Sequence, residues 1–357
     1  VKIPVAFGPR FGDPVLADGA IAAGTIDFWE VCRPFLADPE LLHKTAEDRV
    51  DEIRPCVGGL LCLSRMFRDL PYNCAMNPRL SHEYEPEYEV RPAGVKKRVL
   101  VIGGGPAGLE AAKVAAERGH AVTLMEQREA LGGQLRHAAK EVEGGFIWPK
   151  LVRYYETQLA RYGVEVRLGQ EVNRQVCERL KPDVIVVATG ATLDPRRWPV
   201  AGRPLLNVYD VLEDRAEVGQ RVVVLSGERA GLVCAEYLAA LGRQVTIVEP
   251  GPRLAQDVIP TFKWRHMAWV KEYGIATVTK ATVEAITPEG VTLVDDTGAR
   301  RTLPADTVVA AGPRRSAQDL IEALEFSGDE LYIAGDVIRP RSVHNAVREG
   351  FLVGVRI

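Results

Sequence analysis

Short runs of branched apolar residues alternate with longer amphipathic stretches along most of the chain. The sharpest example spans 97–126, where an apolar strand, a glycine-rich turn, a helix and a second strand follow one another. A second stretch of the same design spans 221–251. Further buried strands are expected at 183–190, 306–313 and 331–336, and a helix at 342–357. The pattern predicts an α/β fold with two related βαβ halves.

The first 95 residues have a different pattern. Residues 1–50 predict strand, helix, strand, helix, and two such units cannot close a parallel sheet by themselves. Residues 51–95 are irregular, hold three cysteines and end in a Pro- and Glu-rich segment that is typical of a linker. We therefore expect four parts, which are 1–50, 51–95, 96–215 together with 300–357, and 216–299.

The composition narrows the class of protein. A chain of 357 residues, 46% hydrophobic and 26% charged, predicts two or three globular domains. No apolar run approaches the roughly 20 residues that span a bilayer. The net charge is -3 and the Lys and Arg residues are scattered, so the chain has no positive electrostatic field that would attract the phosphates of a nucleic acid. We expect a soluble, cytoplasmic protein without nucleic-acid or membrane partners. The start, VKIPVAFGP, lacks Met and a signal peptide, so we expect residues upstream.

Three glycines, Gly103, Gly105 and Gly108, separate strand from helix in the first βαβ half. In this context the first allows a tight turn, the second lets a pyrophosphate approach the backbone, and the third lets helix meet strand. The helix, starting near Pro106, directs its positive end at the phosphates. Glu126 ends the second strand and can accept hydrogen bonds from ribose hydroxyls. We expect this half to bind FAD or ADP.

The second half departs from this pattern. Ser226, Glu228 and Gly231 stand where the three glycines would fall. A carboxylate about 4 Å from a phosphate, at an effective dielectric near 20, costs roughly 4 kcal/mol, or about three decades of affinity. Residues 216–299 therefore predict an NAD(P)-binding-like domain that is impaired.

The cysteine segment has Cys56, Cys62 and Cys74 on a loop with Gly58 and Gly59. Thiolates at this spacing, beside a dinucleotide domain, suit an iron–sulfur cluster better than zinc. A four-iron cluster normally takes four thiolates, and this segment offers three. Two alternatives stay open: an iron–sulfur cluster, either 3Fe-4S or 4Fe-4S with a non-protein fourth ligand, or a vacant relic of such a site.

Together these motifs resemble the old-yellow-enzyme superfamily proteins that join an FMN barrel to two dinucleotide-type domains. These include trimethylamine, dimethylamine and histamine dehydrogenases, N-methyl amine demethylases and 2,4-dienoyl-CoA reductase. PRFGDP at 9–14 and CRPFLADPEL at 32–41 are similar to the last two βα units of that TIM barrel. The resemblance covers the whole chain and implies two Rossmann-like, glutathione-reductase-like domains after a barrel remnant.

The resemblance also implies site residues. Gly8, Arg10 and Arg33 would contact the FMN phosphate, and Gly59 replaces the second cysteine of the cluster motif. Two residues separate Gly59 from Cys62, and LSR follows. This spacing resembles the cluster motif of the amine dehydrogenases more than that of the dienoyl-CoA reductases. Further residues would line the FAD or ADP, and Asp336 would bind a ribityl hydroxyl if the ligand is FAD. These residues are Ala107, Gly133, Gln134, Leu135, Val172, Ala188, Thr189, Gly190, Gly335 and Asp336.

Three functions stay open at this point. The first is a flavin- and iron–sulfur-dependent oxidoreductase that oxidises an N-methyl or primary amine and passes electrons to an acceptor such as an electron-transfer flavoprotein. The second is an NAD(P)H-dependent enoate or 2,4-dienoyl-CoA reductase. The third is a noncatalytic FAD- or ADP-binding partner subunit. We expect a homo-oligomer or a companion barrel subunit, and we name no catalytic residue, because the substrate-binding barrel strands are not in this chain.

Overall fold

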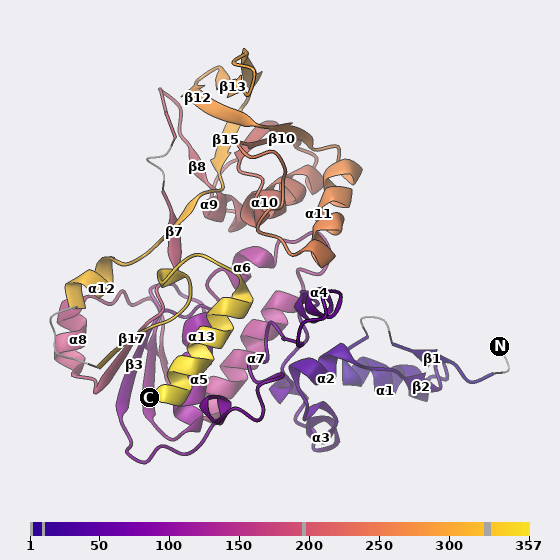
Figure 1. Cartoon of the computed structure of the whole chain (residues 1–357), viewed down its shortest axis with the longest axis vertical. Coiled ribbons are helices and arrows are strands. Elements are labelled where there is room, and N and C mark those ends of the chain that lie inside the picture. The colour runs from indigo at the N-terminus through magenta and orange to yellow at the C-terminus, as the bar shows by residue number, and fades with distance from the viewer. Residues whose placement is uncertain (1–2, 9–10, 195–197, 325–329) are drawn as a thin grey trace. The chain divides into compact units, whose positions relative to one another are not determined.

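The structure is a computed structural model of the chain, and it describes residues 3–8, 11–194, 198–324 and 330–357 (Figure 1). The chain forms two compact units. The first comprises Val1–Gly133, Ile147–Thr189 and Gln318–Ile357, and the second comprises Gln134–Phe146 and Gly190–Ala317.

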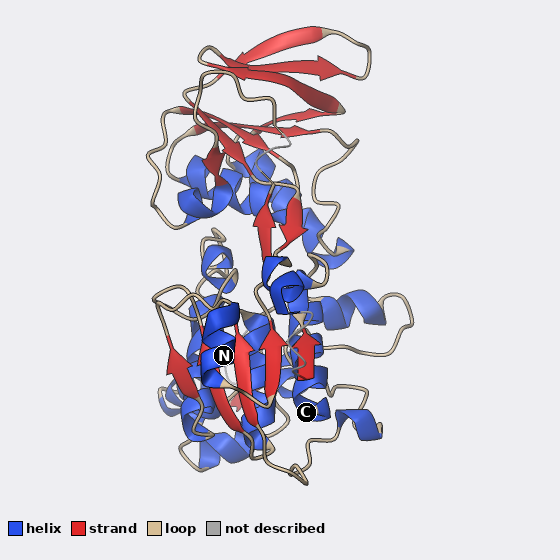
Figure 2. Ribbon diagram, turned by 90° about the vertical axis from the view of Figure 1, so that its left-hand side faces the viewer, coloured by secondary structure: helices blue, strands red, loops and turns tan. Residues whose placement is uncertain are grey.

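The first unit is built on a parallel sheet. Within the described residues its five strands run in the order β17 (Glu330–Ile333), β6 (Val184–Val187), β3 (Arg98–Ile102), β4 (Ala121–Met125) and β5 (Glu165–Arg167). Strand β6 is buried throughout and β3 in all but its first residue, as expected for strands covered on both faces. Figure 2 shows these strands side by side with helices packed along them.

Two helices of this unit lie directly against each other, α5 (Pro106–Glu117) and α13 (Val343–Arg356) (Figure 1). Their contact depends on glycine. A Cβ at Gly350 would lie 2.2 Å from the Ala107 carbonyl oxygen, and one at Gly354 would lie 2.6 Å from Val114 Cβ. The backbones therefore approach more closely than any other residue type would allow.

The second unit contains another parallel sheet. Its described strands run in the order β11 (Ala276–Thr279), β10 (Gln244–Glu249), β9 (Arg221–Leu225), β15 (Thr307–Ala310) and β8 (Leu206–Asn207). An antiparallel sheet of β12 (Ala281–Thr287), β13 (Gly290–Asp295) and β14 (Arg300–Pro304) accompanies it, and β7 (Ala191–Leu193) pairs with β16 (Arg314–Ser316). The helices are α6 (Leu135–Ala138), α9 (Val208–Leu212), α10 (Arg229–Ala240) and α11 (Pro260–Glu272).

The second unit includes more of the chain than residues 216–299, which were expected to form the second dinucleotide-type domain. Strand β15 pairs with β9 on one side and β8 on the other, all in parallel. Strands β8 and β15, which were expected in the first dinucleotide domain, therefore belong to the sheet of the second unit. That unit extends from Gly190 to Ala317. Only the segment from Gln318 onward returns to the first unit.

The first 50 residues have the predicted order of strand and helix. Strands β1 (Ala6–Phe7) and β2 (Phe28–Trp29) pair in parallel, and α1 (Pro14–Ala22), α2 (Arg33–Ala37) and α3 (Leu41–Ala46) accompany them. A two-stranded parallel sheet has little stability alone, and large apolar side chains stay exposed on it. They include Phe7, Val15, Leu16 and Phe28.

The segment between the first strands and the first dinucleotide sheet is irregular, as predicted. It holds η1 (Val50–Glu52), α4 (Leu61–Met66) and η2 (Pro86–Tyr88). The remaining elements of the first unit are α7 (Ile147–Arg161), α8 (Arg174–Leu180), α12 (Asp319–Leu324) and η4 (Gly335–Val337).

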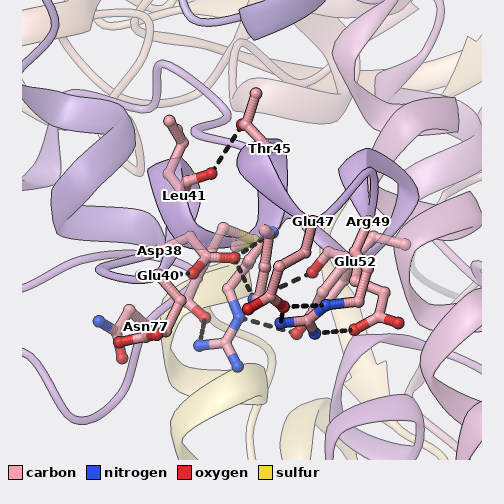
Figure 3. A network of polar contacts seen from close by, with 12 residues as sticks. Asp38, Glu40, Leu41, Thr45, Glu47, Arg49, Glu52 and Asn77 are labelled. Atoms are coloured by element: carbon pink, nitrogen blue, oxygen red, sulfur yellow. Dashed lines mark hydrogen bonds and ion pairs between the residues drawn. The ribbon is translucent and has the colours of Figure 1, made fainter.

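A buried carboxylate joins the first 50 residues to the cysteine segment (Figure 3). Asp38 is only 4% exposed. Its oxygens accept hydrogen bonds from Lys44 Nζ at 2.6 Å and from the Arg54 amide at 2.7 Å. Nearby, Arg49 bridges Glu47 and Glu52 at the surface. Asp38 therefore fixes the backbone just before Cys56.

We predict that Asp38→Ala destabilises residues 38–56. The substitution leaves a half-buried Lys44 ammonium and a backbone amide without their acceptor, and such losses cost about 2–3 kcal/mol. Native-state hydrogen exchange of this segment measures the free energy of opening. Glu47→Ala is the matched control, because that carboxylate is 59% exposed and surface pairs contribute about 0–1 kcal/mol. Equal effects of the two substitutions would contradict the assignment.

Candidate functional site

The turn between β3 and α5 requires glycine at two of its predicted positions. Gly103 has a φ of +110°, and a Cβ there would lie 2.4 Å from the Ala188 carbonyl oxygen. A Cβ at Gly108 would lie 1.9 Å from the Gly103 carbonyl oxygen. The first glycine therefore makes the turn, and the third lets α5 lie against it.

The middle glycine has a different role. Gly105 is the N-cap of α5 and receives no side-chain cap, and a Cβ there would meet no atom within 4 Å. The space beside Gly105 is thus open at the positive end of a helix. An anionic group such as a pyrophosphate fits this position, because the helix dipole and the first-turn amides favour negative charge.

Glu126 lies beside this turn and is 7% exposed. Its carboxylate accepts hydrogen bonds from the Gly104 amide at 2.7 Å and the Arg128 amide at 2.9 Å. A carboxylate has about four acceptor positions, so two bonds leave capacity for ribose hydroxyls. Gly104 itself was not singled out from the sequence, although its amide orients the carboxylate.

The loop after β4 approaches the same turn. The Gly132 amide donates to the Gly104 carbonyl oxygen at 2.8 Å. Gly133 has a φ of +50°, and a Cβ there would lie 2.9 Å from Gly105 Cα. Val172 is half-buried and packs on the core cluster of β3 and β4.

Three other predicted residues belong to the second unit. Gln134 Oε1 accepts from Arg314 Nη1 at 3.0 Å, Leu135 is buried in α6, and Gly190 has a φ of +78°.

The end of β17 reaches the first turn of α5 from another direction. Gly335 has a φ of +84°, and a Cβ there would lie 2.8 Å from Ala107 Cβ. Asp336 Oδ1 accepts from the Arg341 amide at 2.9 Å. Glu349, which sequence reasoning missed, accepts from the Gly335 amide at 2.9 Å and also pairs with Arg341.

The predicted residues that surround the first turn of α5 therefore lie together at the ends of parallel strands, and we call this group, with the open space at Gly105, the first crevice. They are Gly103, Gly105, Pro106, Ala107, Gly108, Glu126, Gly133, Ala188, Thr189, Gly335 and Asp336. Their donor set and open space fit the phosphates and ribose of a dinucleotide.

The turn between β9 and α10 has the same backbone form. A Cβ at Gly231 would lie 2.0 Å from the Ser226 carbonyl oxygen, and Ser226 has a φ of +130°. Glu228 is the N-cap of α10, with φ -76° and ψ 172°, close to the -80° and 178° of Gly105. The structure therefore places the Glu228 side chain where the first crevice has open space.

The predicted FMN contacts are described in part. Gly8 follows β1, and a Cβ there would lie 2.4 Å from the Glu30 carbonyl oxygen, just beyond β2. Arg33 is the first residue of α2. Arg10 lies outside the described residues. Gly8 and Arg33 thus both follow the carboxyl ends of the two parallel strands.

Cys56 interacts electrostatically with both of the other cysteines of the segment, Cys62 and Cys74. Burial raises the pKa of the Cys62 thiol and of the Cys74 thiol, and the Cys56 sulfur raises both further. Arg33 opposes the shift at Cys62. Among the residues that the structure describes, no three His, Cys, Asp or Glu side chains converge as a closed metal site.

Arg54 holds the two flanks of the cysteine segment together. Its Nη1 donates to the Met76 carbonyl oxygen at 2.9 Å, and its Nη2 lies 3.7 Å from Glu110, a buried residue of α5. Burial would raise the pKa of Glu110, but Lys113 and Arg54 outweigh it, so the pKa is lowered. The segment is therefore anchored on the first dinucleotide helix by an ionised carboxylate.

At Gly59 the backbone lies outside the left-handed region, and a Cβ would meet only Val57 Cγ2 at 3.8 Å. The position has room for a side chain.

In the described part of the chain, no helix has the length and apolar character of a membrane-spanning segment.

Comparison with known proteins agrees with this geometry. The family model described as pyridine nucleotide-disulphide oxidoreductase matches residues 77–174 and 97–350. An NADH oxidase of Thermoanaerobacter brockii is 35% identical over 100% of this chain and 56% of its own length. An N,N-dimethylglycine/sarcosine dehydrogenase of Chromohalobacter salexigens is 36% identical over 73% of this chain and 40% of its own length.

Among solved structures, a 2-naphthoyl-CoA reductase in complex with 2-naphthoyl-CoA matches with a TM-score of 0.95 and 33% identity. The match covers 100% of this chain and 54% of that chain. The chain thus spans about half the length of the relatives that it matches from end to end. The predicted pair of dinucleotide-type folds is confirmed.

We predict that Gly105→Glu abolishes binding of ADP or FAD to the first crevice, with an affinity loss of about three decades. The new side chain enters open space, so the fold persists while a carboxylate takes the pyrophosphate position. Calorimetric titration with ADP measures the loss. Gly105→Gln controls for bulk, and an equal loss in both variants would show that volume, and not charge, is decisive.

Proposed function

We propose a function from one premise: this chain belongs to the pyridine nucleotide-disulphide oxidoreductase family, and it matches the C-terminal portion of flavin-dependent oxidoreductases of the old-yellow-enzyme type. The complete protein is proposed to oxidise an N-methyl or primary amine and to pass the electrons to an external acceptor such as an electron-transfer flavoprotein. The observation that carries this proposal is Glu228 at the N-cap of α10.

Glu228 bears on the direction of electron flow. An enzyme driven by NAD(P)H needs a crevice that accepts a second pyrophosphate, and a carboxylate at this position costs roughly 4 kcal/mol at an effective dielectric near 20. An enzyme that delivers electrons to another protein does not need that crevice. The name of the dimethylglycine/sarcosine dehydrogenase, at 36% identity, supports an amine as the substrate class.

The first crevice is proposed to hold FAD or ADP. Gly103, Gly105 and Gly108 would admit the pyrophosphate, and Glu126 would accept from ribose hydroxyls. If the ligand is FAD, Asp336 would accept from a ribityl hydroxyl. A flavin supplies reversible two-electron chemistry when bound, and an iron–sulfur cluster supplies one-electron transfer.

The barrel remnant is proposed to contact an FMN phosphate through Gly8 and Arg33. Both residues follow the ends of parallel strands, the usual phosphate position in such barrels. The exposed apolar side chains of this segment are proposed to pack on the rest of the barrel, in the same polypeptide or in a companion subunit.

The cysteine segment is proposed to hold an iron–sulfur cluster through Cys56, Cys62 and Cys74. Three thiolates leave one iron of a cubane without a protein ligand, so the cluster is 3Fe-4S or takes a non-protein fourth ligand. Arg54 would keep the two flanks of the segment in place.

A second candidate is an NADH-driven reductase of enoates or CoA thioesters. The observation that favours it is whole-chain similarity, at 35% identity to the NADH oxidase and a TM-score of 0.95 to the 2-naphthoyl-CoA reductase. In that case electrons would flow in the opposite direction.

We predict that the complete protein, kept anaerobic, loses its flavin absorbance on addition of a methylated amine and keeps it on addition of NADH. Stopped-flow spectrophotometry measures both reactions in parallel. Glu228→Gln serves as the control for the charge at α10. Rapid bleaching of the native protein by NADH, with none by amines, would favour the reductase.

We predict that Gly59→Cys completes a four-thiolate set. Bound iron then rises from about three to about four per chain if the native cluster is 3Fe-4S, and stays at about four if a non-protein ligand already holds the fourth iron. Iron analysis and electron paramagnetic resonance of the purified full-length protein measure the change. Gly94→Cys, in the linker with open space around its Cβ, is the control for an added thiol. Iron that is absent from both variants would contradict the cluster.

A further inference from the structure

The turn between β9 and α10 repeats most of the backbone contacts of the turn between β3 and α5. A Cβ at Gly227 would lie 2.3 Å from Leu254 Cδ2, and one at Gly104 would lie 2.7 Å from Leu131 Cδ2. The loop after β10 bonds back in the same way, since the Ala255 amide donates to the Gly227 carbonyl oxygen at 2.7 Å.

The ribose-binding carboxylate is also retained. Glu249 ends β10 and accepts from the Gly227 amide at 2.8 Å and from the Gly251 amide at 2.8 Å. Glu126 makes the equivalent pair of bonds in the first unit. Glu249 therefore has the same remaining acceptor capacity for ribose hydroxyls.

The difference between the two turns lies in side chains at the start of α10. The Arg229 amide donates to Asp257 Oδ1 at 2.9 Å, and the Glu228 amide donates to Ser226 Oγ at 3.2 Å. The amino end of α10 is thus occupied by acceptors of the same chain, one of which is a full negative charge. At α5 the N-cap residue is Gly105, which has no side chain that could place a charge at the amino end of the helix.

We propose that the β9–α10 turn is an NAD-type site closed by two of its own carboxylates, Asp257 and Glu228, and that removing both charges opens it to NAD+ in preference to NADP+. Asp257 and Glu228 hold negative charge at the helix end where a pyrophosphate would bind. Glu249 sets the preference, because a carboxylate accepts from a ribose 2′-hydroxyl and repels a 2′-phosphate.

This inference deepens the proposed function, because it names the contacts that keep a nicotinamide nucleotide out. Its test nevertheless measures binding and no turnover. A gain of NAD+ binding without amine oxidation would leave the inference standing and would contradict only the proposed substrate.

The test is calorimetric titration of the full chain, loaded with FAD or ADP and freed of excess ligand. Oxidised NAD+ and NADP+ are the probes, because neither can reduce a flavin. Glu228→Gln with Asp257→Asn keeps side-chain shape and removes both charges. We expect NAD+ to bind at least about 100-fold more tightly than to the native chain, in line with the cost of a carboxylate beside a phosphate.

Two controls isolate the cause. Glu272→Gln with Asp296→Asn removes two exposed carboxylates of the same unit and changes the net charge equally, so NAD+ binding should stay at the native level. Adding Glu249→Ala to the opened variant should weaken NAD+ binding about 10-fold and remove the preference over NADP+.

Two results would overturn the proposal. One is saturable, micromolar NAD+ binding by the native chain. The other is no gain in the opened variant while its thermal unfolding and its bound FAD or ADP match those of the native chain. If the double variant unfolds, Glu228→Gln and Asp257→Asn are titrated singly, and no gain in either would be equally contradictory.

Discussion

In both units the dinucleotide-type fold depends on the close approach of a helix to the turn that precedes it. At α5 the carbonyl oxygen of Gly103 takes the space that a Cβ at Gly108 would need, and at α10 that of Ser226 does the same at Gly231. This contact places the amino end of each helix at the carboxyl edge of its sheet. The carboxylate after the second strand then bonds to the turn, and the rest of each crevice follows.

The same backbone frame has opposite electrostatics in the two units. In the first, a bare Gly105 leaves space at the positive end of a helix. In the second, Glu228 and Asp257 bring negative charge to the equivalent end. Since each close pair of like charges costs several kcal/mol at an effective dielectric near 20, two side chains are enough to change which crevice accepts a nucleotide, with no change of fold.

The sequence predicted those parts of the structure that depend on local pattern. Strand β3, its turn and α5 form within a single short stretch, so periodicity and three glycines identified them together with Glu126. Among the residues that were not predicted, Asp257 and Glu349 reach their turns from other segments of the chain through hydrogen bonds to backbone amides. No spacing in the sequence marks such a contact. The boundaries of the second unit at Gly190 and Ala317 were not predicted either. They depend on the pairing of β15 with β9, a strand from a distant part of the chain.

We propose that this chain has one open dinucleotide crevice and one that its own carboxylates close. The most direct measurement is the amount of adenine nucleotide released by heat from the purified native chain after incubation with FAD, ADP and NAD+ together, followed by removal of free ligand. We expect one nucleotide per chain, either FAD or ADP. Two nucleotides per chain, one of them NAD+, would contradict the closed second crevice, and none would contradict the open first one.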